Sequence, residues 1–156
     1  HGPNTFRSTH ERMAGFTKGL ADFGLTLDPA LTTETRYGAP VDRRGFEAVE
    51  HIVCIGASGD VLSEEIEIAL AIEVSEDGSS WAPVTEARDV LGGTPDETGV
   101  FAVIDDVAAD QSEHAIGYIG AARYTRIAVL LTGSHAAGTP IAALALLGAA
   151  HLKPVM

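Results

Sequence analysis

The segment 117–133, GYIGAARYTRIAVLLTG, combines two tyrosines and two arginines with an apolar run. Guanidinium groups beside aromatic rings are suited to gripping phosphate or nucleic acid, and the same residue types also mark the solvent end of a packed strand. Because the following aliphatic residues alternate between two faces, we predict a turn followed by a core strand. The arginines are then expected to pair with carboxylates of this chain or of a neighbouring subunit. The four side chains are Tyr118, Arg123, Tyr124 and Arg126.

The charge balance argues against a nucleic-acid partner. The sequence has 22 acidic against 10 basic residues, a formal net charge of -12, and an acidic surface repels phosphate backbones and anionic lipid. No stretch approaches the roughly 20 consecutive apolar residues that a membrane helix needs, so we expect no membrane span. The N-terminus lacks a basic region followed by an apolar run, so we expect no signal peptide.

Metal and catalytic motifs are missing from the sequence. The six histidines show no short ligand spacing, so we predict no metal site. Asp77 and the segment DDVAAD at 105–110 offer oxygen ligands for Ca²⁺ but lack the spacing of a calcium loop, which favours solvated acidic loops. With no phosphate-cradling loop, nucleophile elbow or dinucleotide fingerprint, we predict no catalytic residue and no cofactor. A glycosidase carboxylate pair stays open, because carboxylates are plentiful.

The single cysteine, Cys54, lies in the apolar run IVCIG, so the chain has no intramolecular disulfide. Free cysteine is among the most buried residue types, and we predict a core thiol. A nucleophilic cysteine would need a base, and His51 is the only close candidate. On a strand, His51 and Cys54 point to opposite faces, which argues against such a pair.

The pattern from about residue 35 onward predicts strands. In EEIEIALAIEVS, at 64–75, aliphatic residues alternate with acidic residues and alanine, and Asp77-Gly78 then supplies the turn of a hairpin. We expect Trp81, beside this hairpin, to be buried in the core. Seven or eight such segments, separated by Gly, Asp, Ser and Pro clusters, predict an all-β fold, a jelly-roll-like antiparallel β-sandwich. The segment 141–150, IAALALLGAA, is assigned as a strand, with a helix as the less favoured alternative.

The first residues differ from the rest. At 156 residues the chain suits one domain, which we place at 33–156, preceded by an arm at 1–32. Apolar side chains in the arm follow the spacing of one helix face, but Gly15 and Gly19 would make such a helix marginal. We interpret the arm as a segment that packs on the domain or on a neighbouring subunit; a frayed extension is the alternative. The spaced side chains are Met13, Phe16, Leu20 and Phe23.

The block 117–155 resembles the C-terminal half of a family of small β-sandwich virion proteins, encoded by tailed bacteriophages and by the gene transfer agents of alphaproteobacteria. Two upstream segments, 37–56 and 73–84, resemble the first strands and hairpin of that family. The resemblance covers about 35–155 and is a pattern of strands and turns. The matching residues are Gly117-Tyr118-Ile119-Gly120, Arg123-Tyr124-x-Arg126, Thr132-Gly133, Thr139-Pro140-Ile141, Leu147-Gly148 and Pro154-Val155.

This resemblance implies a non-enzymatic structural protein, a capsid decoration protein or the base of a head spike. Its location would be the virion, assembled in the bacterial cytoplasm. Its partners would be capsid or other virion proteins, and we expect a homo-oligomer. The N-terminal arm departs from the family pattern, so we place attachment to the capsid or to another subunit there, and inter-subunit ion pairs at Arg123 and Arg126. The attachment residues are Phe6, Met13, Phe16, Leu20 and Phe23.

Two other functions remain open from the sequence. A carbohydrate-binding sandwich that recognises a host surface polysaccharide would present an aromatic platform, although the chain has only one Trp and three Tyr. A hydrolase built on a sandwich is the third hypothesis. The structural and carbohydrate-binding functions are compatible, because the base of a head spike could also bind a host glycan.

Overall fold

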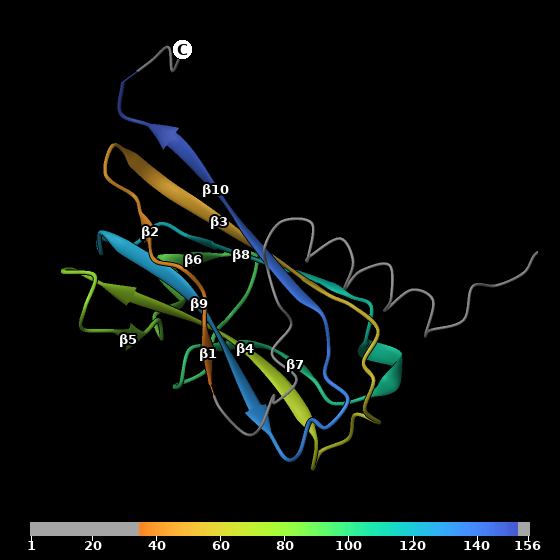
Figure 1. The fold of residues 1–156 in the computed structure, drawn as a ribbon. Helices are drawn as coiled ribbons and strands as arrows, with labels where there is room; N and C mark the ends of the chain where they lie inside the picture. Colours follow the sequence, from red (N-terminus) through yellow and green to blue (C-terminus); the bar gives the residue numbers. More distant parts are fainter. Residues whose placement is uncertain (1–34, 153–156) are drawn as a thin grey trace, which may run out of the picture.

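The computed structural model describes residues 35–152, which form two antiparallel β-sheets packed face to face (Figure 1). The predicted antiparallel β-sandwich is confirmed. Residues 1–34 and 153–156 lie outside the described part, and with them the arm and the five attachment residues assigned to it. Within residues 35–152 no helix is long and apolar enough to cross a membrane.

The larger sheet has six strands, and β9 and β4 form its centre. They pair over their whole lengths, from Glu67 opposite Thr132 to Ser75 opposite Tyr124. The strand order is β1-β9-β4-β5. In addition, β2 pairs with β9, and β7 pairs with β4. The strands are β1 (Arg36–Tyr37), β2 (Val41–Asp42), β4 (Glu67–Ser75), β5 (Ala82–Pro83), β7 (Val100–Ile104) and β9 (Tyr124–Thr132).

The smaller sheet has four strands in the order β10-β3-β8-β6. Its bounds are β3 (Phe46–Ile55), β6 (Val90–Leu91), β8 (Glu113–Tyr118) and β10 (Ile141–Ala150). The segment 141–150 is thus a strand, as predicted, and it pairs with β3 from Ile141 opposite Ile55 to Ala150 opposite Phe46. Two short 3-10 turns, η1 (Ala87–Asp89) and η2 (Val107–Ala109), complete the described elements.

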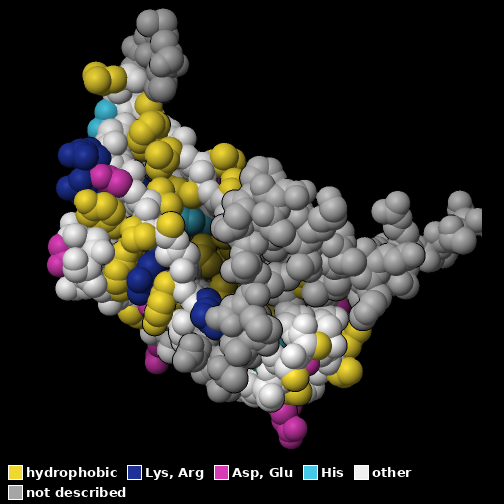
Figure 2. Space-filling model, viewed as in Figure 1, with side chains coloured by type: hydrophobic (Ala, Val, Ile, Leu, Met, Phe, Trp, Pro, Cys, Tyr) yellow, Lys and Arg dark blue, Asp and Glu magenta, His cyan; other side chains and the backbone are white. Residues whose placement is uncertain are grey.

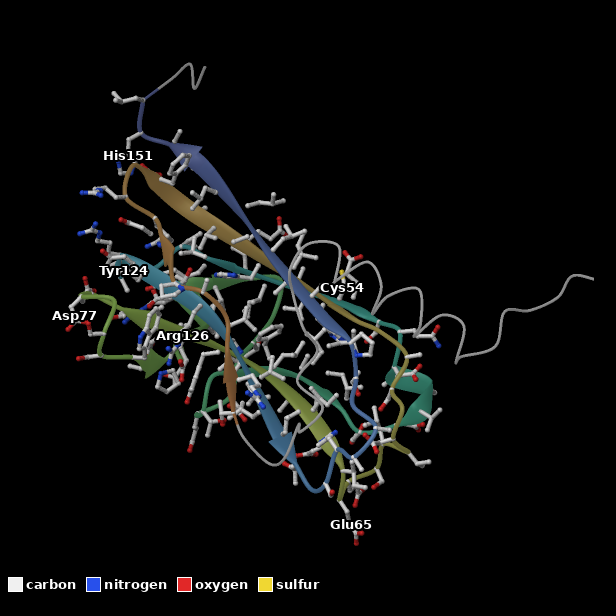
Figure 3. The ribbon with its side chains drawn as sticks, in the orientation of Figure 1. Cys54, Glu65, Asp77, Tyr124, Arg126 and His151 are labelled. Carbon is white, nitrogen blue, oxygen red and sulfur yellow. The ribbon has the colours of Figure 1, made fainter. Side chains whose placement is uncertain are left out.

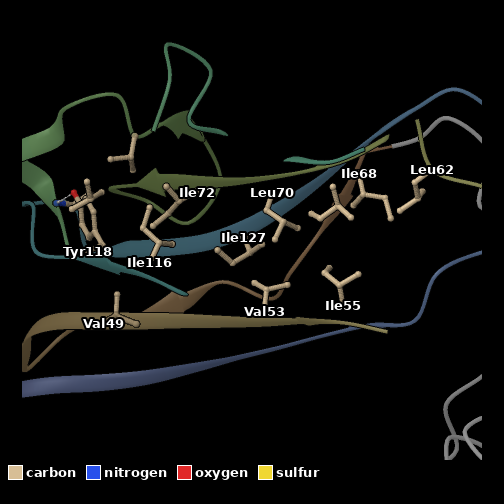
Figure 4. Close-up of a cluster of buried hydrophobic side chains, with 14 residues drawn as sticks. Val49, Val53, Ile55, Leu62, Ile68, Leu70, Ile72, Ile116, Tyr118 and Ile127 are labelled. Atoms are coloured by element: carbon tan, nitrogen blue, oxygen red, sulfur yellow. Dashed lines mark hydrogen bonds between the residues drawn. The ribbon is translucent and has the colours of Figure 1, made fainter. Parts of the chain in front are cut away.

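The core lies between the sheets and follows from the alternation in the sequence. On β4, Ile68, Leu70 and Ile72 are fully buried. They face the smaller sheet, where Val49, Val53 and Ile116 supply the other half of the core (Figure 4). Burying one such aliphatic side chain contributes about 1.5–3 kcal/mol, so this layer holds the two sheets together.

The hairpin predicted at Asp77-Gly78 joins β4 to β5. Gly78 has a φ of 76°, a conformation that glycine adopts without strain. The Asp77 carboxylate accepts hydrogen bonds from the backbone N–H groups of Ser79 and Ser80, both at 2.8 Å, and from the Ser75 hydroxyl at 2.9 Å. These donors, chiefly the two backbone N–H groups, lower the pKa of Asp77 to about 2. Asp77 therefore organises a turn.

Two predictions of burial are wrong. Cys54 is exposed, because Val53 and Ile55 point into the core and the alternation of β3 turns Cys54 outward. Trp81 is only partly buried. It packs on the Arg126 guanidinium, 4.1 Å from the ring centroid, instead of entering the core.

Candidate interaction surfaces

The outer face of the four-stranded sheet is apolar and exposed. On β10, Leu144 and Leu146 lie opposite Ile52 and Glu50 of β3, on the side away from the core. Both leucines remain about half exposed, at 49% and 53%, and Leu91 of β6 is 56% exposed. Hydrophobic side chains are visible along the β10 side of the molecule in Figure 2. Monomeric proteins rarely leave such side chains contiguous, which marks this face for an interaction.

A shallow groove of about 320 Å³ crosses this face. Its lining includes Gly117 of β8 and Gly148 of β10, which have no side chains, and Leu91 and Leu146. A Cβ atom added at Gly117 would come within 3.2 Å of the Leu91 Cβ, so a side chain at this position would crowd Leu91. Among residues 35–152, Glu50 is the only charged residue in its lining. The groove can receive apolar side chains of a partner.

Strand β10 also forms the edge of this sheet. Within the described residues its one strand partner is β3. Its ten residues include no charged side chain and no proline, the devices by which natural proteins protect an edge strand. An unprotected edge offers backbone N–H and C=O groups to a strand from another chain. The apolar face and this edge are contiguous along β10.

The Arg126 side chain lies on the outer face of the six-stranded sheet, between two aromatic rings. Its guanidinium is 3.9 Å from the centroid of Tyr37 and 4.1 Å from that of Trp81. Its Nε and Nη2 both lie 2.7 Å from Oε2 of Glu73, the residue directly opposite on β4. Figure 3 shows Arg126 on this side of the molecule, below Tyr124. The group is a charged stack covered by aromatic rings.

Arg123 makes a more exposed ion pair on the same side. Its Nε donates to Asp42 Oδ1 at 3.0 Å and its Nη2 to Oδ2 at 2.7 Å. The hydrogen bond from Arg123 holds the pKa of Asp42 well below its usual range and raises the pKa of Arg123. Both arginines therefore pair with carboxylates of their own chain, one of the two outcomes predicted. An inter-subunit role for them stays a prediction.

In the segment 117–133, Tyr118 lies apart from the other three side chains considered above, those of Arg123, Tyr124 and Arg126. Tyr118 is buried on β8 of the smaller sheet, and its hydroxyl accepts a hydrogen bond from the Ala122 backbone N–H at 3.1 Å. Burial raises the pKa of Tyr118. Arg123, Tyr124 and Arg126 lie together at the start of β9. The segment is thus a turn and a core strand, as predicted.

Sequence reasoning missed Arg43, which is buried. Its Nε and Nη2 donate to the Ala122 carbonyl at 3.1 and 2.7 Å, its Nη1 donates to the Glu47 carbonyl at 2.7 Å, and its Nη2 also reaches the Gly120 carbonyl. The guanidinium lies over the Tyr118 ring, 4.6 Å from its centroid. The side chain clamps the turn between β8 and β9. The pair Arg43-Arg44 in the sequence gave no sign of which arginine is buried.

The acidic candidates for Ca²⁺ have structural roles. Asp106 accepts a hydrogen bond from the Ala108 backbone N–H at the start of η2, and Asp110 accepts one from Ser58. In residues 35–152 no group of three or more His, Cys, Asp and Glu side chains is placed to hold a metal ion. These acids stabilise loops.

The chain matches no protein-family model, no curated protein and no solved structure. The surfaces themselves are therefore the basis for a functional proposal.

Proposed function

We propose that the protein is a non-enzymatic structural subunit of a virion, from a tailed phage or a gene transfer agent, that decorates the capsid or forms the base of a head spike. The observation that carries the proposal is the exposed apolar outer face of the four-stranded sheet, which continues into the edge of β10. The resemblance of 35–155 to small virion proteins supplies the kind of particle.

The physical properties of the molecule support this role. A shell component needs a rigid domain and affinity from many repeated contacts, and a sandwich with one apolar face offers both. The net charge of -12 suits a protein that stays outside a DNA-filled compartment, because like charges repel. Self-association through β10 would bury its leucines and pair its edge, which makes a homo-oligomer the expected form.

The test compares two exposed apolar side chains on opposite sheets. Leu146, 53% exposed, lies on the outer face of the smaller sheet, and Val103, 44% exposed, lies on β7 of the larger one. Leu146→Lys is expected to abolish self-association in sedimentation velocity and co-sedimentation with particles from the bacterium that carries the gene. Val103→Lys adds the same charge elsewhere and is expected to leave both intact.

Cryo-electron microscopy of those particles completes the test. Density for this sandwich at capsid vertices or hexamer centres is expected. A protein that is monomeric, indifferent to capsids and absent from the particle would overturn the proposal.

A glycan-binding role is the second candidate, and one observation favours it. Tyr37 is 55% exposed and belongs to the stack with Arg126 and Trp81, so an aromatic ring is held rigidly at the surface. Sugars pack on such rings in many binding modules. Retention on host surface polysaccharide that is lost in Tyr37→Ala, and kept in Leu146→Lys, would establish this role. No retention of the unchanged protein would exclude it.

A further inference from the structure

A cavity of about 410 Å³ opens between the two sheets, on the side where β1 and β10 lie. Val53 and Ile68, both fully buried, form its inner wall together with Ile127. Ala143 of β10 lines it on the smaller sheet. Cavities of this size and apolar character are typical of sites for small molecules.

The cavity wall includes a buried histidine with an unused hydrogen-bonding atom. His135 is only 3% exposed. Its Nε2 lies 3.0 Å from the Thr132 carbonyl and 3.2 Å from the Glu67 carbonyl. Because both neighbours are acceptors, Nε2 carries a proton and donates, and in this tautomer Nδ1 is an acceptor. Among the described residues Nδ1 has no partner, and a buried acceptor without a partner is destabilising.

A second polar group in the lining has the same character. The Thr139 hydroxyl donates to Ser58 Oγ at 2.9 Å, so its oxygen is left as an acceptor toward other groups. Arg36 also lines the cavity, and it already has an interaction of its own. Because His135 Nδ1 and the Thr139 hydroxyl oxygen both accept hydrogen bonds, a matching ligand donates a hydrogen bond and carries no negative charge.

We propose that this cavity binds a small, neutral, largely apolar molecule with one hydroxyl group, a phenol or an alcohol, whose hydroxyl donates to His135 Nδ1. The apolar body of the ligand packs against Val129, Leu131 and Ile141, the partly buried aliphatic residues of the lining. The site is independent of the outer face of the smaller sheet, because it lies between the sheets.

The experiment is isothermal titration of the full chain with 2-naphthol and with 2-methoxynaphthalene, which has a similar body but no O–H. We expect saturable binding of 2-naphthol, about two- to tenfold tighter than binding of the ether, since one net hydrogen bond is worth about that range. His135→Phe should remove this preference. Because His135 also holds two backbone carbonyls, a second variant avoids it.

Ala143→Phe fills part of the cavity and leaves His135 itself unchanged. Ala142→Phe, at the preceding residue, places the same side chain on the outer face, opposite Cys54. The first is expected to abolish 2-naphthol binding and the second to preserve it. Absent binding, equal affinity for the two probes, or binding that survives Ala143→Phe would each overturn the proposal. Binding that appears only after removal of 1–34 would overturn it too, since the occupant would then be the chain itself.

Discussion

His51 of the smaller sheet and Thr125 of the larger sheet are joined across the core by a hydrogen bond of 2.8 Å between Nε2 and Oγ1. Both side chains are buried, in the layer that otherwise contains aliphatic residues. Burial lowers the pKa of His51 from 6.5 to about 4, so the ring is neutral in the folded protein at neutral pH. The pair ties one sheet to the other at a fixed register.

This pair makes stability depend on pH. The unfolded chain protonates His51 near pH 6.5 and the folded protein only near pH 4. In that window the unfolded state binds more protons, so the free energy of unfolding falls as the pH drops. Between about pH 7 and about pH 4.5 we expect a loss of about 2–3 kcal/mol from this residue. Urea unfolding at a series of pH values should show this fall in the free energy of unfolding for the unchanged protein and not for His51→Gln. If the two proteins gave parallel plots of this free energy against pH, the prediction would be contradicted.

The buried Arg43 clamp predicts a large difference between adjacent arginines. Arg43→Lys should cost about 3 kcal/mol, because a lysine cannot reach the carbonyls of Glu47, Gly120 and Ala122 together. Arg44 is exposed and its contact with Asp42 is 3.5 Å long, so Arg44→Lys should stay within about 0.5 kcal/mol. Chemical denaturation measures both. Equal losses would show that Arg43 does not hold the turn.

The two surface arginines are expected to respond differently as well. Arg126→Lys should lose about 1–2 kcal/mol of stability, since lysine replaces neither the forked contact to Glu73 nor the stack between the rings. Arg123→Lys should lose less, because its pair with Asp42 is more exposed.

Fluorescence provides a second readout of this pair of variants. Trp81 is the only tryptophan of the chain, and it packs on Arg126. Its emission is expected to shift in Arg126→Lys and to stay unchanged in Arg123→Lys. An unchanged spectrum in both would contradict the stacked arrangement.

Strands with strict alternation were predictable from the sequence. In β4 the aliphatic residues Ile68, Leu70 and Ile72 share one face, and Asp77-Gly78 marks the turn that follows. Length and the flanking Pro140 were enough to assign 141–150 as a strand. These signals are local, because they depend only on the period of the backbone and on turn chemistry.

Features that depend on contacts distant in sequence were not predictable. In IVCIG, apolar residues occupy both faces, so nothing in the run shows that Cys54 points outward. Arg43 is buried because carbonyls 77 and 79 positions away accept its hydrogen bonds. The orphaned Nδ1 of His135 arises from a loop folded onto the β4 backbone. In each case the tertiary fold decides the environment of a residue whose type allows several.

Cys54 offers a direct test of which face assembles. It is the only cysteine, it is exposed, and it lies on the outer face of the smaller sheet between Ala142 of β10 and Glu113 of β8. In the free protein the thiol should react fully with a disulfide reagent such as DTNB. When the protein is self-associated or bound to particles, the apolar face is covered and the rate should fall at least about tenfold.

The matched control moves the thiol to the other sheet. Cys54→Ala combined with Val103→Cys places the only cysteine on the exposed β7 position of the six-stranded sheet. This thiol should react at the same rate in the free and the assembled protein. If Cys54 stayed reactive after assembly while the thiol at 103 became protected, the six-stranded sheet would be the interface. The leucines of β10 would then need another explanation, since exposed apolar side chains along an unprotected edge strand are costly for a protein that leaves them uncovered.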